Sequence, residues 1–272
     1  MESCILLHNN FYKSSEILMD GTLKLLEKLH ISVVRTESIA LDDKFLPFIS
    51  PVVYFSSLIK LLEGAYKEGQ KVFVCDSKSL SVIRMLLKKL YKDIGFREEI
   101  SKKCECNIDI LNLEDSFVFA PEVFLDKIGT TEIKRKRWEG FRCAFIIDRE
   151  LEGRVKELRL LPNIESVTGL KIFPFFKDDY AYLLQSNPEL SFKMGAMDYY
   201  EMVDCGVDFI MSANIGNFEL MDKNTRKLQD ISGRDIAEIP LLFIPQVILA
   251  LFMDTNAKSL SFNAHKIQPQ ML

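Results

Sequence analysis

Five residues with oxygen-bearing side chains stand where apolar segments end in the second half of the chain: Asp148, Asp178, Asp179, Asn214 and Asn217. Open α/β sheets bind ligands at the carboxyl ends of their parallel strands, so we expect these side chains to converge on one cleft. Carboxylate and amide oxygens suit a hard cation such as Mg²⁺ or Ca²⁺. Two other interpretations stay open. The cleft binds another small polar ligand, or it is vestigial, with Asn214 an ordinary helix N-cap and the aspartates solvated loop residues.

A second set of candidates lies in the first half of the chain: His8, Asn9, Cys75 and Lys78. His8 and Asn9 end the first apolar segment and would line a first cleft. Cys75 follows a strand-like segment and precedes a helix, whose N-terminus lowers the pKa of a thiol. Lys78, one turn further on, would add to that effect. Cys75 is therefore a candidate redox thiol, with an inert residue as the alternative.

The other cysteines offer less chemistry. Cys104 and Cys106 make half a zinc site at most, or belong to a surface loop. Cys4, Cys143 and Cys205 fall on or beside apolar segments, which predicts small core residues. Six cysteines in 272 residues, three of them placed in this way, indicate reduced thiols rather than a disulfide framework. We predict no metal and no cofactor.

Alternating strand and helix segments must position these residues, and this alternation predicts parallel βαβ units. The segment 95–140 is less regular. The predicted strands are Cys4–His8, Ile31–Arg35, Lys71–Val74, Phe141–Ile147, Leu170–Pro174 and Val207–Met211. The predicted helices are Lys13–His30, Ser50–Lys67, Ser77–Tyr91, Arg149–Leu161 (ending near Pro162), Pro188–Val203, Ile215–Asp222 and Gln246–Phe252.

The chain repeats itself at an offset of about half its length. Cys4-Ile-Leu-Leu-His-Asn9 returns 139 residues later as Cys143-Ala-Phe-Ile-Ile-Asp148. A proline, a helical stretch and a glycine 18 residues later occur at Pro51 and again at Pro188. The repeat predicts two homologous domains, with a cleft in each or between them. We place the first at 1–133, a basic linker at 134–140 and the second at 141–272.

The composition restricts the class of protein. A hydrophobic content of 48% and a charged content of 27% are typical of a folded globular chain. The net charge of −4 argues against nucleic-acid binding, so we interpret the basic run Lys134–Arg137 as a solvated interdomain linker. The longest apolar stretch, Ile239–Met253, contains two prolines and is too short to span a bilayer. We expect a soluble, cytoplasmic protein.

The second half carries four motifs in a fixed order and spacing: Lys177–Leu190 with its Pro-Glu-Leu end, Gly206–Asn217 with its Gly-Val-Asp start, Ile239–Leu251, and Leu260–His265. With the repeat, this order resembles the heterodisulfide reductase B-subunit family, whose members include the iron–sulfur subunits of glycolate oxidase and of lactate utilisation. The resemblance covers almost the whole chain. It implies two copies of a cysteine-rich domain, whose cysteines in heterodisulfide reductase hold iron–sulfur clusters that split a disulfide.

The family's cysteine positions carry other residues in this chain. In the second copy they fall on the five aspartates and asparagines named above. In the first copy the lone cysteine falls on Asn9, the cysteine pair lies within 38–43, and the Cys-x-x-Cys aligns with Cys75 and Lys78. An iron–sulfur cluster needs several converging thiolates, and a lysine ammonium has no lone pair to offer. The resemblance therefore predicts the fold but not the clusters.

Together these observations predict two duplicated α/β domains, each a small, mostly parallel sheet flanked by helices. We favour a protein of the heterodisulfide reductase B-subunit type that has lost its cluster ligands, a pseudoenzyme that acts as a scaffold or partner subunit of a cytoplasmic complex. The alternative is a redox or metal-dependent enzyme subunit that uses Cys75 or the acidic second cleft. An exposed apolar patch would favour the first hypothesis, because it would offer a docking surface to a protein partner.

Overall fold

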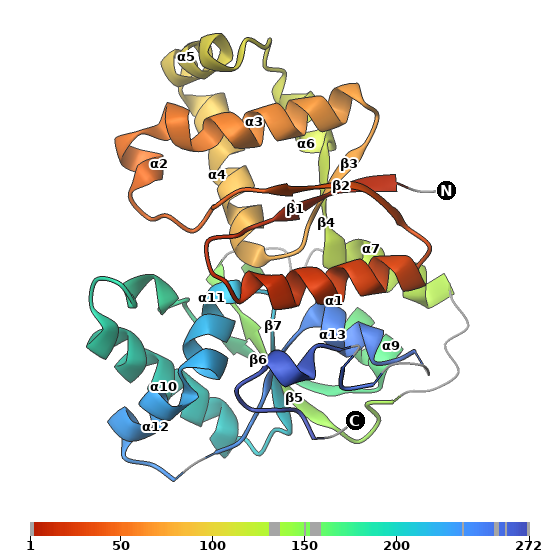
Figure 1. Ribbon diagram of the computed structural model, residues 1–272, viewed down its shortest axis with the longest axis vertical. Coiled ribbons are helices and arrows are strands. Elements are labelled where there is room, and N and C mark those ends of the chain that lie inside the picture. The colour runs from red at the N-terminus through yellow and green to blue at the C-terminus, as the bar shows by residue number, and fades with distance from the viewer. Residues whose placement is uncertain are drawn as a thin grey trace.

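Two four-stranded sheets, one in each half of the chain, form the framework of the protein. The computed structural model describes residues 3–130, 137–149, 151–152, 159–235, 237–252, 256–258 and 260–270 (Figure 1). All paired strands are parallel, and the strand orders are β2-β1-β3-β4 and β6-β5-β7-β8. The second order repeats the first, so the prediction of two duplicated α/β domains is confirmed.

The first domain alternates strands with helices, and a run of helices leads to its last strand. Its elements are β1 (Ser3–His8), α1 (Ser15–Lys28), β2 (Ser32–Ser38), α2 (Leu46–Ile49), α3 (Pro51–Lys67), β3 (Lys71–Val74), α4 (Ser77–Lys92), α5 (Ile94–Cys104), α6 (Ile110–Asp115), β4 (Phe117–Phe119) and α7 (Ala120–Thr130).

The second domain follows the same plan with shorter helices after its third strand. Its elements are β5 (Arg142–Ile147), α9 (Leu160–Thr168), β6 (Lys171–Phe176), η1 (Ala181–Leu183), α10 (Pro188–Asp204), β7 (Phe209–Ser212), α11 (Ile215–Phe218), η2 (Glu219–Lys223), α12 (Thr225–Ser232), β8 (Leu241–Phe243), α13 (Ile244–Leu249) and η3 (Phe262–Ala264).

The repeated proline and glycine set the ends of the same helix in both domains. Pro51 and Pro188 occupy the first helical position of α3 and α10, where the missing N–H costs no intrahelical bond. Gly69 and Gly206 follow these helices with φ of 65° and 64°, the left-handed conformation that glycine adopts without strain. The 18-residue spacing therefore measures one helix and the turn into the third strand.

Two sequence predictions about elements are wrong. The segment 95–140, expected to be less regular, contains α5, α6, β4 and α7 in the part that the structure describes. Around Pro162 a helix begins instead of ending, because a proline is tolerated in the first turn, and α9 runs from Leu160 to Thr168. Of the helix expected before it, residues 150 and 153–158 lie outside the described residues.

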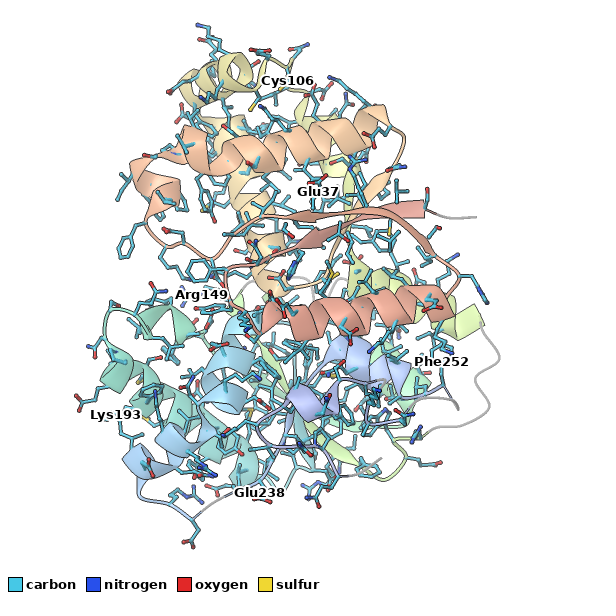
Figure 2. The ribbon with its side chains drawn as sticks, in the orientation of Figure 1. Glu37, Cys106, Arg149, Lys193, Glu238 and Phe252 are labelled. Carbon is cyan, nitrogen blue, oxygen red and sulfur yellow. The ribbon has the colours of Figure 1, made fainter. Side chains whose placement is uncertain are left out.

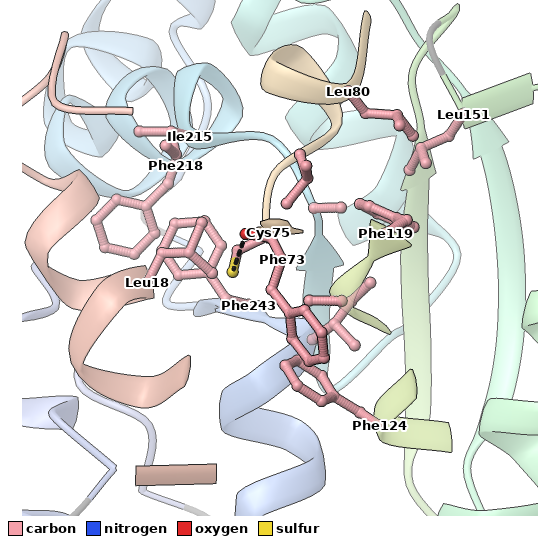
Figure 3. Packing of buried hydrophobic residues seen from close by; sticks show 14 of the residues in the cluster. Leu18, Phe73, Cys75, Leu80, Phe119, Phe124, Leu151, Ile215, Phe218 and Phe243 are labelled. Atoms are coloured by element: carbon pink, nitrogen blue, oxygen red, sulfur yellow. Dashed lines mark hydrogen bonds between the residues drawn. The ribbon is translucent and has the colours of Figure 1, made fainter. Parts of the chain in front are cut away.

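The domains are joined through a shared core, in which each domain contributes matching helix contacts. Helix α1 packs on α13, and its symmetry counterpart α9 packs on α7 (Figure 1). Gly21 of α1 faces α13, and a Cβ there would lie in ordinary contact, 3.4 Å from Cγ of Gln246. Buried side chains of both domains form one apolar cluster, in which Leu18 and Phe73 lie beside Phe218 and Phe243 (Figure 3). This continuous core fixes the strand ends of one domain against those of the other.

The end of the predicted linker belongs to this core. Trp138 is fully buried, donates from Nε1 to the Val247 carbonyl at 2.9 Å, and packs against Phe209. Arg137 donates to the Ala250 carbonyl at 3.2 Å. The solvated character expected of this segment therefore does not hold for Trp138, while residues 134–136 lie outside the described residues. None of the helices described here combines the length and apolarity needed to cross a bilayer.

Candidate functional site

Strand register defines which strand-end residues of the two domains are equivalent. The last residue pair of the β1–β3 ladder is Leu7 with Val74. The last residue pair of the β5–β7 ladder is Ile146 with Ser212. Counting onward from these pairs, Asn9 corresponds to Asp148 and Asp76 corresponds to Asn214. Residues far apart in the sequence thus occupy the same place at the carboxyl edge of each sheet.

Helix capping supports this equivalence and corrects the sequence alignment by one residue. Asp76 caps α4 by accepting from the Ser79 N–H at 2.8 Å, and Asn214 caps α11 by accepting from the Gly216 N–H at 2.7 Å. The sequence alignment places Cys75, not Asp76, opposite Asn214. By register, the counterpart of Cys75 is Ala213, so Cys75 does not occupy the position that Asn214 occupies in the second domain.

Three of the second-cleft candidates come together as predicted. Asp148 accepts from Nδ2 of Asn214 at 3.0 Å and from the Leu151 N–H at 3.0 Å. Asn217 donates to the Ser212 hydroxyl at 3.3 Å, and the Asn214 N–H donates to the same hydroxyl at 3.0 Å. These buried side chains bond to one another and to the backbone, apart from Oδ1 of Asn217, which has no hydrogen-bond partner among the described residues.

Asp178 and Asp179 lie further out. Asp179 accepts from the Ala181 N–H at 2.9 Å and approaches α11, where a Cβ added to Gly216 would lie 2.7 Å from its Oδ1. Asp178 is exposed and faces Arg149, with 3.5 Å between Oδ2 and Nη2. The prediction that all five side chains converge is therefore wrong for Asp178. Within the part of the chain that the structure describes, no cluster of three or more His, Cys, Asp or Glu side chains is arranged to hold a metal ion.

In the first domain, the predicted residues line a very small cavity. His8, Asn9 and Cys75 border a space of about 10 Å³, the room of roughly one water molecule. Asn9 accepts from the Leu41 N–H at 3.1 Å, while its amide nitrogen is buried without a hydrogen-bond partner among the described residues. His8 is held between the hydroxyls of Ser15 at 2.8 Å and Ser38 at 3.2 Å. Burial lowers the pKa of His8, against the effect of Glu16 and Asp76.

The expectation of a lowered pKa at Cys75 is wrong. Cys75 is buried against Leu18, Phe73 and Phe243, with its Sγ 4.0 Å from the Phe73 carbonyl (Figure 3). Burial raises the pKa of its thiol well above the usual value, because a thiolate would be desolvated there. The helix N-terminus does not compensate, since Asp76 already caps it with a carboxylate. The redox role of Cys75 stays a prediction that the burial disfavours.

The remaining cysteines are free thiols, most of them in the interior. Cys4 and Cys143 are core residues as predicted, whereas Cys205 is exposed, because it is the residue that caps α10. Cys104 is buried at the end of α5, and burial together with Glu63 raises the pKa of Cys106 to about 12. Neither position favours a thiolate ligand.

A polar seam connects the strand ends of the two domains. The Ser77 N–H donates to the Ala213 carbonyl at 2.9 Å, and the Ser77 hydroxyl donates to Oδ2 of Asp148. Ser14 of the first domain donates to Oε2 of Glu219 at 2.6 Å. Sequence reasoning missed Ser77, because a domain interface leaves no periodic signal in either copy.

Beyond this seam lies a larger pocket between the domains, which we call the interdomain pocket. It measures about 340 Å³ and is lined by Lys44, Lys78, Arg149, Asp178, Asp179, Tyr180 and Tyr182. Figure 2 places Arg149 at the boundary between the two domains. Lys78 and the two aspartates come from different predicted clefts, so one pocket unites residues that the sequence assigned to two. Lys44, Arg149 and the tyrosines were not predicted.

Asp42 is buried next to Lys78, which lines this pocket. Its Oδ1 lies 4.0 Å from Nζ of Lys78, and burial raises its pKa to about 7 with a further contribution from Asp179 across the interface. Lys44 lies over the Tyr182 ring, 4.8 Å from Nζ to the centroid. Burial and the neighbouring Lys78 ammonium lower the pKa of Lys44. Perturbed ionisable groups in a pocket mark a candidate functional site.

Comparison with solved structures shows the same fold at low sequence identity. A hypothetical protein from Helicobacter pylori superposes with a TM-score of 0.78 and 19% identity over 100% of this chain. The chain spans only 53% of the length of that protein. A periplasmic sugar-binding protein from Pseudomonas fluorescens aligns with a TM-score of 0.32 and 10% identity over 89% of this chain and 68% of its own. That similarity is too low to carry an argument.

Comparison by sequence matches part of the second domain to a family model. No curated protein matches the chain. The model of the HdrB-like C-terminal domain matches residues 180–266, which include α10, β7, β8 and the polar strand-end residues Asn214 and Asn217. This is the resemblance that the motifs between Lys177 and His265 predicted. Residues 180–266 therefore match the HdrB-like C-terminal domain, which supports the resemblance of this chain to HdrB-like proteins.

Proposed function

We propose that this HdrB-like protein works without iron–sulfur clusters, as a non-catalytic scaffold or partner subunit that associates with another protein. The observation that carries the proposal is an exposed apolar surface on the first domain, which we call the α2 patch. It consists of Phe45, Leu46, Phe48, Ile49 and Val53, whose side chains are 42–79% exposed. Large apolar residues gathered in this way mark a protein interaction site far more often than an inert surface.

The α2 patch is rigidly held although it is exposed. Asp43 accepts from the N–H groups of Phe45 and Leu46 at 2.8 Å each and so fixes the start of α2. Pro51 begins α3 directly afterwards. A preformed apolar surface loses little conformational entropy on binding, which favours a docking role.

The strand ends support the absence of clusters. The positions equivalent to the family's ligands hold amide and carboxylate side chains that bond to one another, as in the Asp148–Asn214 pair. The cavity beside Cys75 has room for about one water molecule, at about 10 Å³. Iron–sulfur clusters take thiolate ligands and need far more space. These residues do not fit such a group.

The first experiment is expression under anaerobic conditions with iron and sulfide, followed by metal analysis and a visible spectrum. We expect a colourless protein without stoichiometric iron. Stoichiometric iron with thiolate-to-iron charge-transfer absorption would contradict the cluster-free proposal and restore a redox role.

The second experiment tests the docking surface. A photo-crosslinking residue at position 48 should capture a specific partner in cells, and the same residue at position 91 should not. Tyr91 is a matched control, because it is an aromatic residue with nearly the same exposure, 78% against 79%, but lies on α4. The Phe48→Ser variant should lose the partner, and Tyr91→Ser should retain it. Equal capture at both positions would refute the α2 patch as the docking surface.

A further inference from the structure

The interdomain pocket is not explained by a scaffold role. Its volume of about 340 Å³ lies within the range that proteins use for small ligands. Residues from both domains line it, and ligand sites occur preferentially at such boundaries. Its lining of charged and aromatic side chains is also chemically unlike the packed strand ends, where amide and carboxylate groups bond to one another.

Two lysines converge on the first-domain side of the pocket. Lys44 and Lys78 line the same pocket, and the Lys78 ammonium contributes to lowering the pKa of Lys44, because like charges repel. Lys78 is buried, and its ion pair with Asp42 is long, at 4.0 Å. Placing two ammonium groups together in a poorly solvated pocket is unfavourable, and a bound anion would offset that cost.

Arg149 faces the lysines from the second domain. Its contact with Asp178 is 3.5 Å long, and both side chains are largely exposed, at 80% and 49%. An exposed ion pair of this length contributes little and is easily exchanged for a better partner. A guanidinium presents parallel donors that match the oxygens of a phosphate or a carboxylate.

The charge of the lining agrees with an anionic ligand. Three cations and two carboxylates line the pocket, whereas the whole chain carries a net charge of −4. One of the carboxylates, Asp179, is already bonded to the Ala181 N–H. The lining thus carries one excess positive charge on an acidic protein, which the carboxylate of Asp42 behind Lys78 offsets in part when it is ionised, and Tyr180 and Tyr182 complete the lining.

We propose that the interdomain pocket binds a small, doubly charged oxyanion, of the class of inorganic phosphate and short dicarboxylates. Lys44 and Lys78 hold one side of the anion, and Arg149 turns from Asp178 to hold the other. The inference is independent of the proposed scaffold function, because it rests on different residues and its test needs no protein partner.

Titration calorimetry with inorganic phosphate and, separately, with succinate tests the proposal at constant ionic strength near pH 7. We expect saturable binding of one anion per chain for at least one of the two probes, and the preferred probe identifies the ligand class. Lys44→Met should weaken binding about ten-fold or more, the usual effect of removing one charged hydrogen-bond donor.

The matched control is Lys89→Met. Lys89 lies over the Phe96 ring at 4.9 Å, as Lys44 lies over Tyr182, but it belongs to the far side of the first domain. Its substitution should leave the affinity unchanged. Absence of saturable binding for both probes, or equal weakening by the two substitutions, would overturn the proposal.

Amine labelling gives a second readout that does not depend on a variant. Limited acetylation followed by peptide mass spectrometry should modify Lys44 early, and the bound anion should protect it while leaving Lys89 unaffected. Labelling of Lys44 that is insensitive to saturating anion would also overturn the proposal.

Discussion

The backbone N–H of Ser77 in the first domain donates to the carbonyl oxygen of Ala213 in the second domain at 2.9 Å. Both residues lie just beyond the third strand of their own sheet. The Ser77 side chain also bonds to Asp148, which ends the first strand of the second sheet. The domains are therefore joined by hydrogen bonds at the edge where α/β sheets usually bind ligands. Space for a ligand remains in the interdomain pocket, which lies outside this hydrogen-bonded edge.

Ser77→Ala tests how much the side-chain hydrogen bond of this seam contributes to the free energy of unfolding. The variant keeps the backbone bond to Ala213 but removes a donor from the buried carboxylate of Asp148. Leaving part of a buried acceptor unpaired should lower the free energy of unfolding by about 1–2 kcal/mol in urea denaturation. Ser57→Ala, at an exposed position of α3, is the control and should change it little. Equal effects of the two substitutions would argue against a stabilising seam.

Cysteine reactivity should follow burial rather than sequence position. Native protein treated with iodoacetamide near neutral pH should be alkylated first at exposed Cys205. Cys75 should react only after unfolding, because burial raises the pKa of its thiol and keeps the reagent out. Peptide mass spectrometry over time measures both. Alkylation of native Cys75 ahead of Cys205 would revive the hypothesis of a redox thiol.

Gly216 is required by a close approach between α11 and the Asp179 loop. A Cβ there would lie 2.7 Å and 2.8 Å from the two carboxylate oxygens of Asp179, which is closer than real contacts allow. Gly216→Ala should therefore lower the free energy of unfolding by about 1–3 kcal/mol. In an Asp179→Ala background the same substitution should cost much less, and the double-mutant cycle measures this coupling. If the effects of Gly216→Ala and Asp179→Ala on the free energy of unfolding are additive, the strain does not come from the contact with Asp179.

Much of the fold was predictable because local signals agreed with it. The apolar runs of β1 and β5 and the Pro51–Gly69 and Pro188–Gly206 spacings indicated the duplicated plan. The strands β4 and β8 were missed because each has only three residues, which is too short for a periodic pattern. The helices α5 and α6 were missed because both are short and rich in polar residues, which leaves too few apolar positions for a clear helical pattern.

The candidate site was predictable only where one domain determines it. The rule that strand ends converge predicted the meeting of Asp148 and Asn214. It failed for Asp178, whose loop extends the chain away from the sheet. Lys44 and Arg149 escaped notice because the pocket that they line forms only between the two domains. No pattern within a single copy encodes such a pocket.

Asp42 should make stability depend on pH in the direction opposite to that of an ordinary salt-bridged carboxylate. Burial raises its pKa to about 7 in the folded protein, with Asp179 and Asp76 acting in the same direction and Lys78 and Lys44 against them. The folded state therefore binds more protons than the unfolded state, whose aspartates have a pKa of about 3.9. Stability contributed by protonated Asp42 is present at acidic pH and is lost as the pH rises from about 4 through about 7.

Asp42→Asn imitates the protonated carboxyl and should remove this dependence. At about pH 8 the variant should be more stable than the natural protein, by at most about 4 kcal/mol, since one pKa unit corresponds to about 1.4 kcal/mol. At about pH 5 the difference should be smaller, about 1.5 kcal/mol, because the natural side chain is then protonated in the folded state but already ionised in the unfolded state. Urea denaturation at both pH values measures the difference, with Asp43→Asn as the neighbouring control. A variant less stable at pH 8 than at pH 5, relative to the natural protein, would mean that the contact of ionised Asp42 with Lys78 outweighs its burial.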